Sequence, residues 1–410
     1  MPNLKEVIIS ITNRCNLRCR MCDIPGGKSE ELPTDQWKKV ISDASRLGSQ
    51  TIVFSGGEPL LREDIFELIY FTRKNKLNAC LTSNGCLIDS QAASRLSASG
   101  VNVVNISIEG SKGTHDHLRG EGSFEKALSA LENLRSQRIE STVASTVSRY
   151  NYKELPYILE VAKNYGSTTV RLQPFNLIFL KDRASGAGFF IDEADIQKME
   201  GLIGRFISVS KEYKISVNPE SYLRKIPAYL AGRRSHPRNC AALWYSCPIA
   251  SNGDVFPCWI EAANNKLIGN IREEGLYELW LSGKRMKMVN SIVNNGCSGC
   301  LMSCYDEVFG SRLSKAYLLD KAKKVKKIAS YQRLANKAGQ LLKSQATTMK
   351  LRYRFYASYR GSVTNLLKRR LSRILNKLQG PEKTGGDEKE MALLEISRLK
   401  TKLEKEIRSL

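Results

Sequence analysis

Three cysteines near the N-terminus have a spacing that suits metal chemistry. Cys15, Cys19 and Cys22 lie at intervals of four and three residues, directly after a short apolar segment. Thiolates are good ligands for iron–sulfur clusters and for zinc. Three thiolates from one short loop can hold three irons of a [4Fe–4S] cube, which leaves the fourth iron open to chelate a small molecule. Half of a zinc site is the alternative that the spacing alone leaves open.

A second group of six cysteines lies between residues 240 and 304. The 410-residue chain holds 11 cysteines, grouped as C-x3-C-x2-C and C-x2-C-x3-C, and this grouping favours metal thiolates in a reducing compartment over a disulfide framework. We find no targeting pattern at the N-terminus and no uncharged apolar segment long enough to span a membrane. We therefore expect a cytoplasmic protein.

Short β-rich segments alternate with helical patterns from residue 5 to about residue 175, which predicts an α/β fold with a parallel sheet and helices outside it. The first helical pattern starts at Thr34, the expected N-cap, and ends at Gly48. Chemistry in such a sheet is expected at the C-terminal ends of the strands. The expected strands are 6–11, 51–56, 78–84, 101–110, 140–147 and 167–175.

The pattern becomes less regular after residue 175. Residues 176–239 predict a loop, a helix from about residue 193 to residue 213, and a strand after it. Residues 240–310 are rich in loops and cysteines, so metal ligation replaces a hydrophobic core there. Asn252 and Gly253 predict a tight hairpin turn in which both residues adopt positive φ angles.

Several motifs in the first part of the chain resemble those of the radical S-adenosylmethionine (SAM) superfamily. The three-cysteine loop matches that family's signature, and GGEP (56–59), TSNG (82–85), SIEG (107–110) and HDHLRGEGSF (115–124) resemble its later motifs in the same order. Met21 replaces the aromatic residue that usually precedes the third cysteine, and Glu109 replaces the usual aspartate. The resemblance implies a partial (β/α)6 TIM-like barrel over residues 1–175, with residues 176–239 as a connecting segment that completes the core.

The resemblance also implies the site residues. Cys15, Cys19 and Cys22 would bind a [4Fe–4S] cluster whose open iron takes SAM. The residues expected to bind SAM are Gly56, Gly57, Glu58, Pro59, Asn84, Ser107, Glu109 and Arg119. No catalytic acid or base is assigned.

The second cysteine group resembles the SPASM/Twitch extension of radical SAM enzymes. The spacing from Cys240 through Gly253 to Cys258 fits that extension, as does GNIREEGLYELW before the last cysteines. We expect residues 240–310 to form a small cluster domain with one auxiliary [4Fe–4S] cluster. Zinc is an alternative metal, because similar thiolate sets bind it. The expected ligands are Cys240, Cys258, Cys297 and Cys300, with Cys247 and Cys304 as rivals.

The net charge of +23 comes mostly from the tail, since residues 311–380 carry 19 Lys and Arg against the single acid Asp320. These residues show basic amphipathic helical patterns, and residues 381–410 form a polar linker followed by a short amphipathic or coiled-coil helix. A solvated helical face is the simplest interpretation. Peripheral contact with the inner face of a membrane is the favoured functional one, and nucleic acid is a disfavoured partner.

We therefore expect a radical SAM enzyme that modifies a peptide or protein side chain. Flavodoxin or ferredoxin is the expected electron donor. The alternatives are oxidation or epimerisation of a sugar or lipid-linked glycan, or another small-molecule substrate. A non-catalytic iron–sulfur protein for electron transfer or assembly is an alternative of another class.

Overall fold

Six parallel strands form the centre of the computed structural model, which describes residues 4–25, 30–233, 244–264, 266–295, 297 and 299–302. Consecutive strands among these six pair in parallel, from β1 with β2 to β5 with β6. The six strands are β1 (Glu6–Thr12), β2 (Thr51–Gly56), β3 (Asn78–Ser83), β4 (Val103–Ser107), β5 (Glu140–Val147) and β6 (Thr169–Pro174). The predicted parallel α/β sheet and partial barrel are confirmed.

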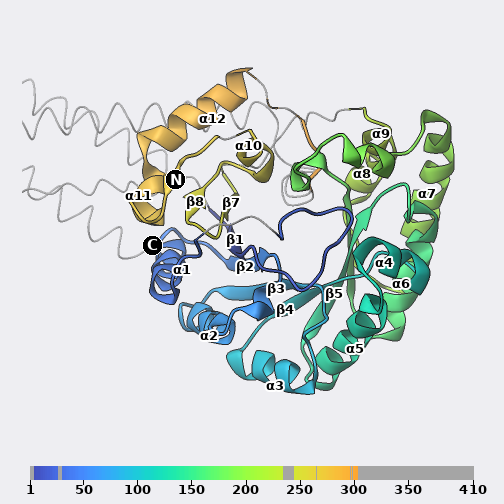
Figure 1. Ribbon diagram of the computed structural model, residues 1–410, viewed down its shortest axis with the longest axis horizontal. Helices are drawn as coiled ribbons and strands as arrows, with labels where there is room; N and C mark the ends of the chain where they lie inside the picture. Colours follow the sequence, from blue (N-terminus) through green and yellow to red (C-terminus); the bar gives the residue numbers. More distant parts are fainter. Residues whose placement is uncertain are drawn as a thin grey trace, which may run out of the picture. The chain divides into compact units, whose positions relative to one another are not determined.

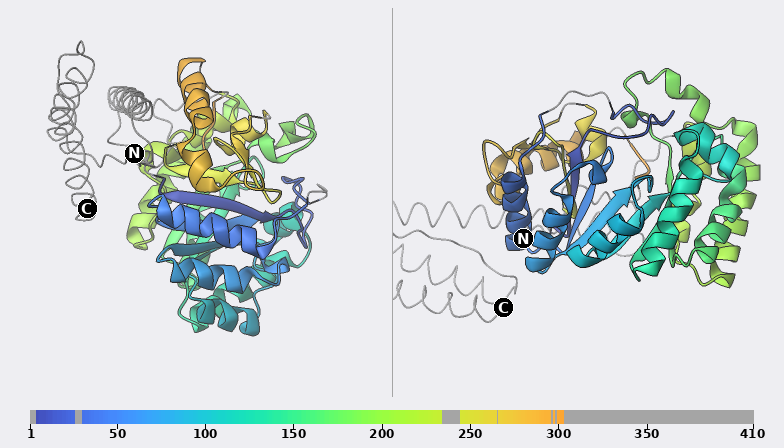
Figure 2. Two further views of the ribbon diagram at one scale, coloured as in Figure 1. Left: turned by 90° about the vertical axis from the view of Figure 1, so that its left-hand side faces the viewer. Right: turned by 60° about the horizontal axis from the view of Figure 1, so that its bottom comes forward.

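Helices connect the strands and cover the outer face of the curved sheet (Figures 1 and 2). The helices that follow β1 to β6 in turn are α1 (Thr34–Arg46), α2 (Ile65–Lys74), α3 (Ser90–Ser99), α4 (Lys112–Arg119) with α5 (Ser123–Ser136), α6 (Leu155–Asn164) and α7 (Ile196–Glu212). The predicted Thr34 cap is wrong, because Thr34 is already in α1 and its hydroxyl binds the Asp64 carboxylate at 2.6 Å.

The strands present two chemically different faces. On the helix side, alternate residues such as Ile9, Phe54 and Leu81 are fully buried, and burial of each such side chain contributes about 1.5–3 kcal/mol. The other face carries many polar side chains, among them Thr82 and Asn105, which line a cavity. This alternation means that the strands enclose a cavity whose wall includes polar side chains.

The cysteine-rich segment adds strands to the same sheet. β7 (Ser246–Ile249) pairs in parallel with β1. β8 (Asp254–Val255) pairs in antiparallel with β7, and β9 (Gly269–Asn270) pairs in antiparallel with β8. The predicted hairpin is present, but only Gly253 takes a positive φ (93°), and Asn252 does not. The remaining helices are α8 (Glu220–Leu223), α9 (Ile226–Leu230), α10 (Trp259–Ala262), α11 (Leu276–Leu281) and α12 (Gly283–Asn295).

Two further predictions concern the residues that follow β6. The helix expected at residues 193–213 is present as a 3-10 turn followed by α7. The strand expected after it is reduced to one bridge, in which Ser216 pairs with Thr169. Within the described ranges, no helix is both long and apolar enough to cross a membrane. The predicted tail helices at 311–380 and 381–410 lie outside the described residues.

Glu6, at the start of β1, is a half-buried carboxylate in the wall of the cavity, and desolvation raises its pKa to about 7. Between about pH 4.5 and pH 7, Glu6 keeps its proton in the folded protein but loses it in the unfolded chain. The free energy of unfolding therefore falls as pH rises through that range. We expect Glu6→Gln to stabilise the protein by roughly 1–2 kcal/mol at about pH 8 and hardly at all below about pH 4.5.

Equilibrium urea unfolding of the full-length protein at both pH values measures this difference. Glu212→Gln, which changes an exposed carboxylate at the end of α7, is the matched control. An equal gain at both pH values for Glu6→Gln would contradict the assignment.

Candidate functional site

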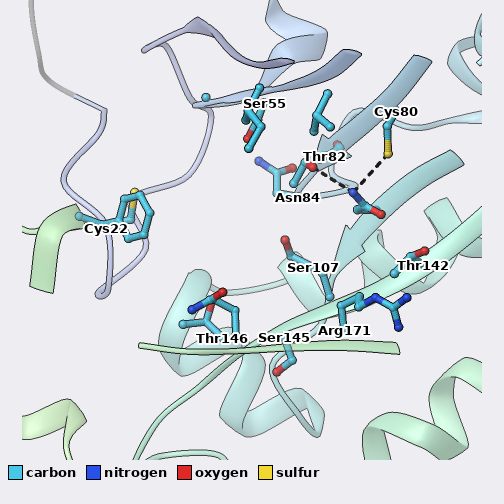
Figure 3. Close-up of a pocket in the computed structure, with 18 of the residues that line it drawn as sticks. Cys22, Ser55, Cys80, Thr82, Asn84, Ser107, Thr142, Ser145, Thr146 and Arg171 are labelled. Atoms are coloured by element: carbon cyan, nitrogen blue, oxygen red, sulfur yellow. Dashed lines mark hydrogen bonds between the residues drawn. The ribbon is translucent and has the colours of Figure 1, made fainter. Parts of the chain in front are cut away.

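A cavity of about 980 Å³ lies inside the six-stranded sheet. Its lining includes residues at the C-terminal ends of β1 to β4, such as Cys15, Gly57 and Ser107, and residues at the opposite ends of the strands, such as Glu6. Figure 3 shows Cys22 on one side of this cavity and Thr142 on the other. A ligand of considerable size can therefore extend from the thiols into the interior of the sheet.

Backbone hydrogen bonds between two strand ends fix the loop that carries the three N-terminal cysteines. The N–H of Gly57 donates to the carbonyl of Thr12 at 2.7 Å, and the N–H of Glu58 donates to the carbonyl of Arg14 at 2.8 Å. Gly57 lies so close to this loop that a Cβ atom would be 2.7 Å from the carbonyl carbon of Arg14. Glycine at this position therefore allows the loop to lie directly against the end of β2.

The three thiols lie near one another without converging on one point. No three His, Cys, Asp or Glu side chains among the described residues are grouped to hold a single metal ion. A cube of four irons needs one thiolate at each of three corners, and the three thiols of this loop can supply them. Cys15, Cys19 and Cys22 are half-buried.

Burial and a nearby cation have opposing effects on the charge of the three thiols. Burial raises the pKa of Cys15, Cys19 and Cys22, the last to about 11, while the charge of Arg119 lowers the pKa of all three. The Cys19 thiol also lies 3.9 Å from the carbonyl oxygen of Arg119. A cation beside three thiols stabilises their deprotonated, metal-binding form.

Glu58 is fully buried behind the end of β3. Its carboxylate accepts hydrogen bonds from the backbone N–H groups of Leu60 and Asn84 and from the Ser83 hydroxyl, at 2.9–3.1 Å. Burial raises its pKa to about 7, against the opposing effect of these bonds. The Asn84 side chain in turn donates to Asn16 at 2.8 Å and lies 3.8 Å from the Cys15 sulfur. Glu58 therefore positions Asn84 beside the thiol loop.

Glu109 is also fully buried, and both of its oxygens have partners. Oε1 accepts from Nε of Arg119 at 2.8 Å, and Oε2 accepts from the Thr146 N–H at 2.8 Å and the Ser145 hydroxyl at 3.2 Å. The ion pair holds the Arg119 guanidinium at the edge of the cavity. Ser107 faces the cavity, and its hydroxyl has no hydrogen-bond partner among the described residues.

The C-terminal cysteines that the structure describes fall into two environments. Cys258 and Cys300 lie in a small cluster with Met302, and the proximity of Cys300 contributes to the raised pKa of Cys258, after the larger effect of burial. Cys247 instead lies in β7, fully buried in the main core beside Val7 of β1. Cys297 is half-buried, and Cys240 and Cys304 lie outside the described residues.

Phe179 connects the two thiol regions. Its carbonyl accepts from the N–H of Asp23, next to Cys22, and its side chain packs against the cluster of Cys258 and Cys300. Phe179 and Met302 both line the cavity. The cavity is therefore bordered by the N-terminal thiols and by residues next to the C-terminal ones.

The structure brings most of the predicted site residues to one cavity. Those that line it are Cys15, Cys19, Cys22, Gly56, Gly57, Asn84, Ser107 and Arg119, whereas Glu58, Pro59 and Glu109 lie behind it. Sequence analysis missed Ser145 and Thr146, which anchor Glu109, and it missed Arg171 and Gln173 of β6. The alternation of polar and apolar residues along β6 was the available signal for the last two.

Comparisons with known proteins agree with this geometry. The sequence model of the radical SAM superfamily matches residues 9–162, and that of an iron–sulfur cluster-binding domain, SPASM, matches residues 240–304. An AdoMet-dependent heme synthase of Methanosarcina barkeri is 31% identical over 303 residues, which cover 68% of this chain and 83% of that protein.

Two other proteins are similar over comparable lengths. The mycofactocin maturase MftC of Mycobacterium ulcerans is 26% identical over 314 residues, 75% of this chain and 82% of its own. The crystal structure of Streptococcus suis SuiB bound to S-adenosylmethionine has a TM-score of 0.58 at 15% identity, with 74% of this chain and 72% of SuiB covered. The similarity to SuiB concerns the fold.

Gly57 offers a test of how the thiol loop is positioned. In Gly57→Ala the added methyl group overlaps the Arg14 backbone, so we expect the loop to shift and the iron bound after anaerobic reconstitution to fall by at least about half. Iron analysis and circular dichroism measure binding and folding separately. Gly204→Ala in α7, where a Cβ atom meets nothing within 4 Å, is the control. Full iron binding by Gly57→Ala would show that the close contact is unimportant.

Proposed function

This chain belongs to the radical SAM superfamily and carries a SPASM domain, and we propose that it modifies a side chain of a peptide or protein. Membership makes it an enzyme that uses SAM, a [4Fe–4S] cluster and an auxiliary cluster. The curated relatives are enzymes, which decides against a non-catalytic electron-transfer protein. The observation that supports the proposal most directly is the large cavity, lined by both apolar and polar groups, that begins at the three N-terminal thiols.

The residues present fit the expected cofactors. Cys15, Cys19 and Cys22 would hold the first cluster, because they share one loop and lie beside the Arg119 cation. When bound, this cluster would supply the one-electron reducing chemistry that the family uses to cleave SAM. The protein contributes placement and the exclusion of water.

Several side chains are suited to orient SAM. The backbone of Gly56 and Gly57 lines the cavity next to the thiol loop and can accept the amino group of the methionine part. The free hydroxyl of Ser107 can bind a ribose oxygen, and Arg119 can bind the carboxylate. Glu58 and Glu109 would act indirectly, by fixing Asn84 and Arg119.

For the auxiliary cluster we propose Cys258 and Cys300 as ligands, together with Cys297 and Cys240. The proximity of Cys258 to Cys300 and their position beside the cavity support this set. Cys247 is disfavoured, since it packs in the main core against β1. A cluster beside the cavity is suited to accept the electron that remains after hydrogen abstraction, which favours a net oxidation of the substrate.

The proposal of a peptide substrate rests on the relatives that are maturases. By its name MftC matures mycofactocin, and a further solved structure shows SuiB bound to its precursor peptide SuiA. The open cavity can admit an extended segment of a peptide. The electron donor would be a flavodoxin or a ferredoxin.

A second candidate substrate is a tetrapyrrole. The heme synthase of Methanosarcina barkeri is more similar in sequence than the maturase, at 31% against 26% identity. The cavity volume of about 980 Å³ also suits a ligand of this size.

The test begins with anaerobically reconstituted, dithionite-reduced full-length protein. We expect it to release 5′-deoxyadenosine from SAM and to change the mass of a peptide encoded next to its gene, as measured by mass spectrometry after co-expression. SAM cleavage without a mass change in any neighbouring peptide would reject the peptide proposal. A mass change in an added porphyrin would then support the second candidate.

Iron analysis tests the auxiliary ligands. We expect about eight irons per chain in the parent protein and about four in Cys258→Ala or Cys300→Ala, because each substitution removes a ligand of the auxiliary cluster. Cys247→Ala is the matched control: it should keep about eight irons and lose about 1 kcal/mol of stability. Iron loss in Cys247→Ala, with none in Cys258→Ala, would reverse the assignment.

A further inference from the structure

Arg171 in β6 points into the cavity and contributes a positive charge to its wall. Residues Thr169, Arg171 and Gln173 alternate along this strand and all line the cavity. Figure 3 shows the guanidinium of Arg171 extending toward Thr142, on the side away from Cys22. The position is therefore inside the sheet and distinct from the thiol loop.

The guanidinium has no counter-ion within the part of the chain that the structure describes. Its Nη1 atom is buried and has no hydrogen-bond partner there. The other cation of the cavity wall, Arg119, is paired with Glu109. An arginine whose buried donors lack acceptors is costly, and the cost is removed when a ligand supplies an anionic group.

The carboxylates that also line the cavity do not neutralise Arg171. Glu6 forms no ion pair with Arg171 among the described residues, and desolvation alone accounts for its raised pKa of about 7. Glu140 is exposed at the start of β5, where it accepts a hydrogen bond from Thr168 at 3.3 Å. The groups next to Arg171 in the cavity wall, such as Thr142 and Gln173, are neutral.

The strand register places Arg171 close to the expected SAM site. Ser107 of β4 pairs with Ala144 of β5, and Ala144 pairs with Arg171 of β6. The three residues therefore form one layer across the sheet. Ala144, whose side chain is small, lines the cavity between Ser107 and Arg171.

We propose that Arg171 binds a carboxylate of the substrate and so fixes its depth in the cavity. The planar guanidinium can donate two parallel hydrogen bonds to a carboxylate, and the burial of Nη1 strengthens the bond that this atom donates. The inference deepens the proposed function, on which it rests, because it assigns a carboxylate to the substrate. A peptide Asp, Glu or C-terminus and a tetrapyrrole propionate are the two sources of that group.

Two pairs of probes distinguish the sources. The first pair is coproporphyrin III, which carries propionates, and its methyl ester, with binding followed by porphyrin fluorescence. The second pair is a short capped peptide with a central glutamate and its glutamine counterpart, with binding followed by fluorescence anisotropy of a labelled peptide. The protein is the reconstituted full-length chain.

We expect the acid of one pair to bind more tightly than its neutral partner. Arg171→Gln should weaken that binding at least about tenfold, and Arg171→Lys should weaken it less, because lysine keeps the charge but not the planar fork. Arg205→Gln on the exposed face of α7 is the matched control and should bind like the parent. SAM affinity should be unchanged in Arg171→Gln.

The remaining outcomes overturn the proposal. No preference for acid over neutral probe in either pair, or equal binding by parent and Arg171→Gln, would exclude a carboxylate site at Arg171. A loss of SAM affinity in Arg171→Gln would assign this residue to the cofactor. Arg171-dependent binding without any substrate turnover would leave the carboxylate site standing and reject the proposed function alone.

Discussion

The position of the three N-terminal thiols depends on two backbone hydrogen bonds beyond the ends of β1 and β2. The donors are the N–H groups of Gly57 and Glu58, and the acceptors are the carbonyls of Thr12 and Arg14. These bonds continue the parallel pairing of the strands past the sheet, so the loop that starts at Arg14 leaves the sheet in a fixed direction. Only a residue without a side chain fits between the loop and β2, which explains the glycine at position 57.

The same site uses buried carboxylates to fix the groups that face the cavity. Glu58, after β2, holds the turn that carries Asn84, and Glu109, after β4, holds Arg119. Both carboxylates are fully buried, and each accepts several hydrogen bonds. Burial of a charged group is costly unless its hydrogen-bonding capacity is satisfied, so these partners are fixed in position as well. The polar residues of the cavity wall are thus held by a polar layer behind them.

The sequence predicted the six parallel strands and the thiol loop well, because apolar periodicity and motif order are local signals. It did not distinguish residues that face the cavity from those behind it, as Glu58 and Glu109 illustrate. Their orientation depends on partners such as Ser145, which is 36 positions from Glu109. The cap at Thr34 failed for a similar reason, because its hydroxyl binds Asp64 from another element.

The strands of the cysteine-rich segment explain how residues next to the C-terminal thiols come to border the cavity of the N-terminal ones. β7 pairs with β1 on the side opposite β2, so the strand before Cys15 is held on both sides. The chain then returns to the cavity wall, where Gln173 of β6 donates to the carbonyl of Leu301 at 2.8 Å, next to Cys300. Each thiol region is therefore attached to the central sheet by backbone hydrogen bonds or by a short polar contact. Their separation is set by the sheet itself, which suits a substrate held between them.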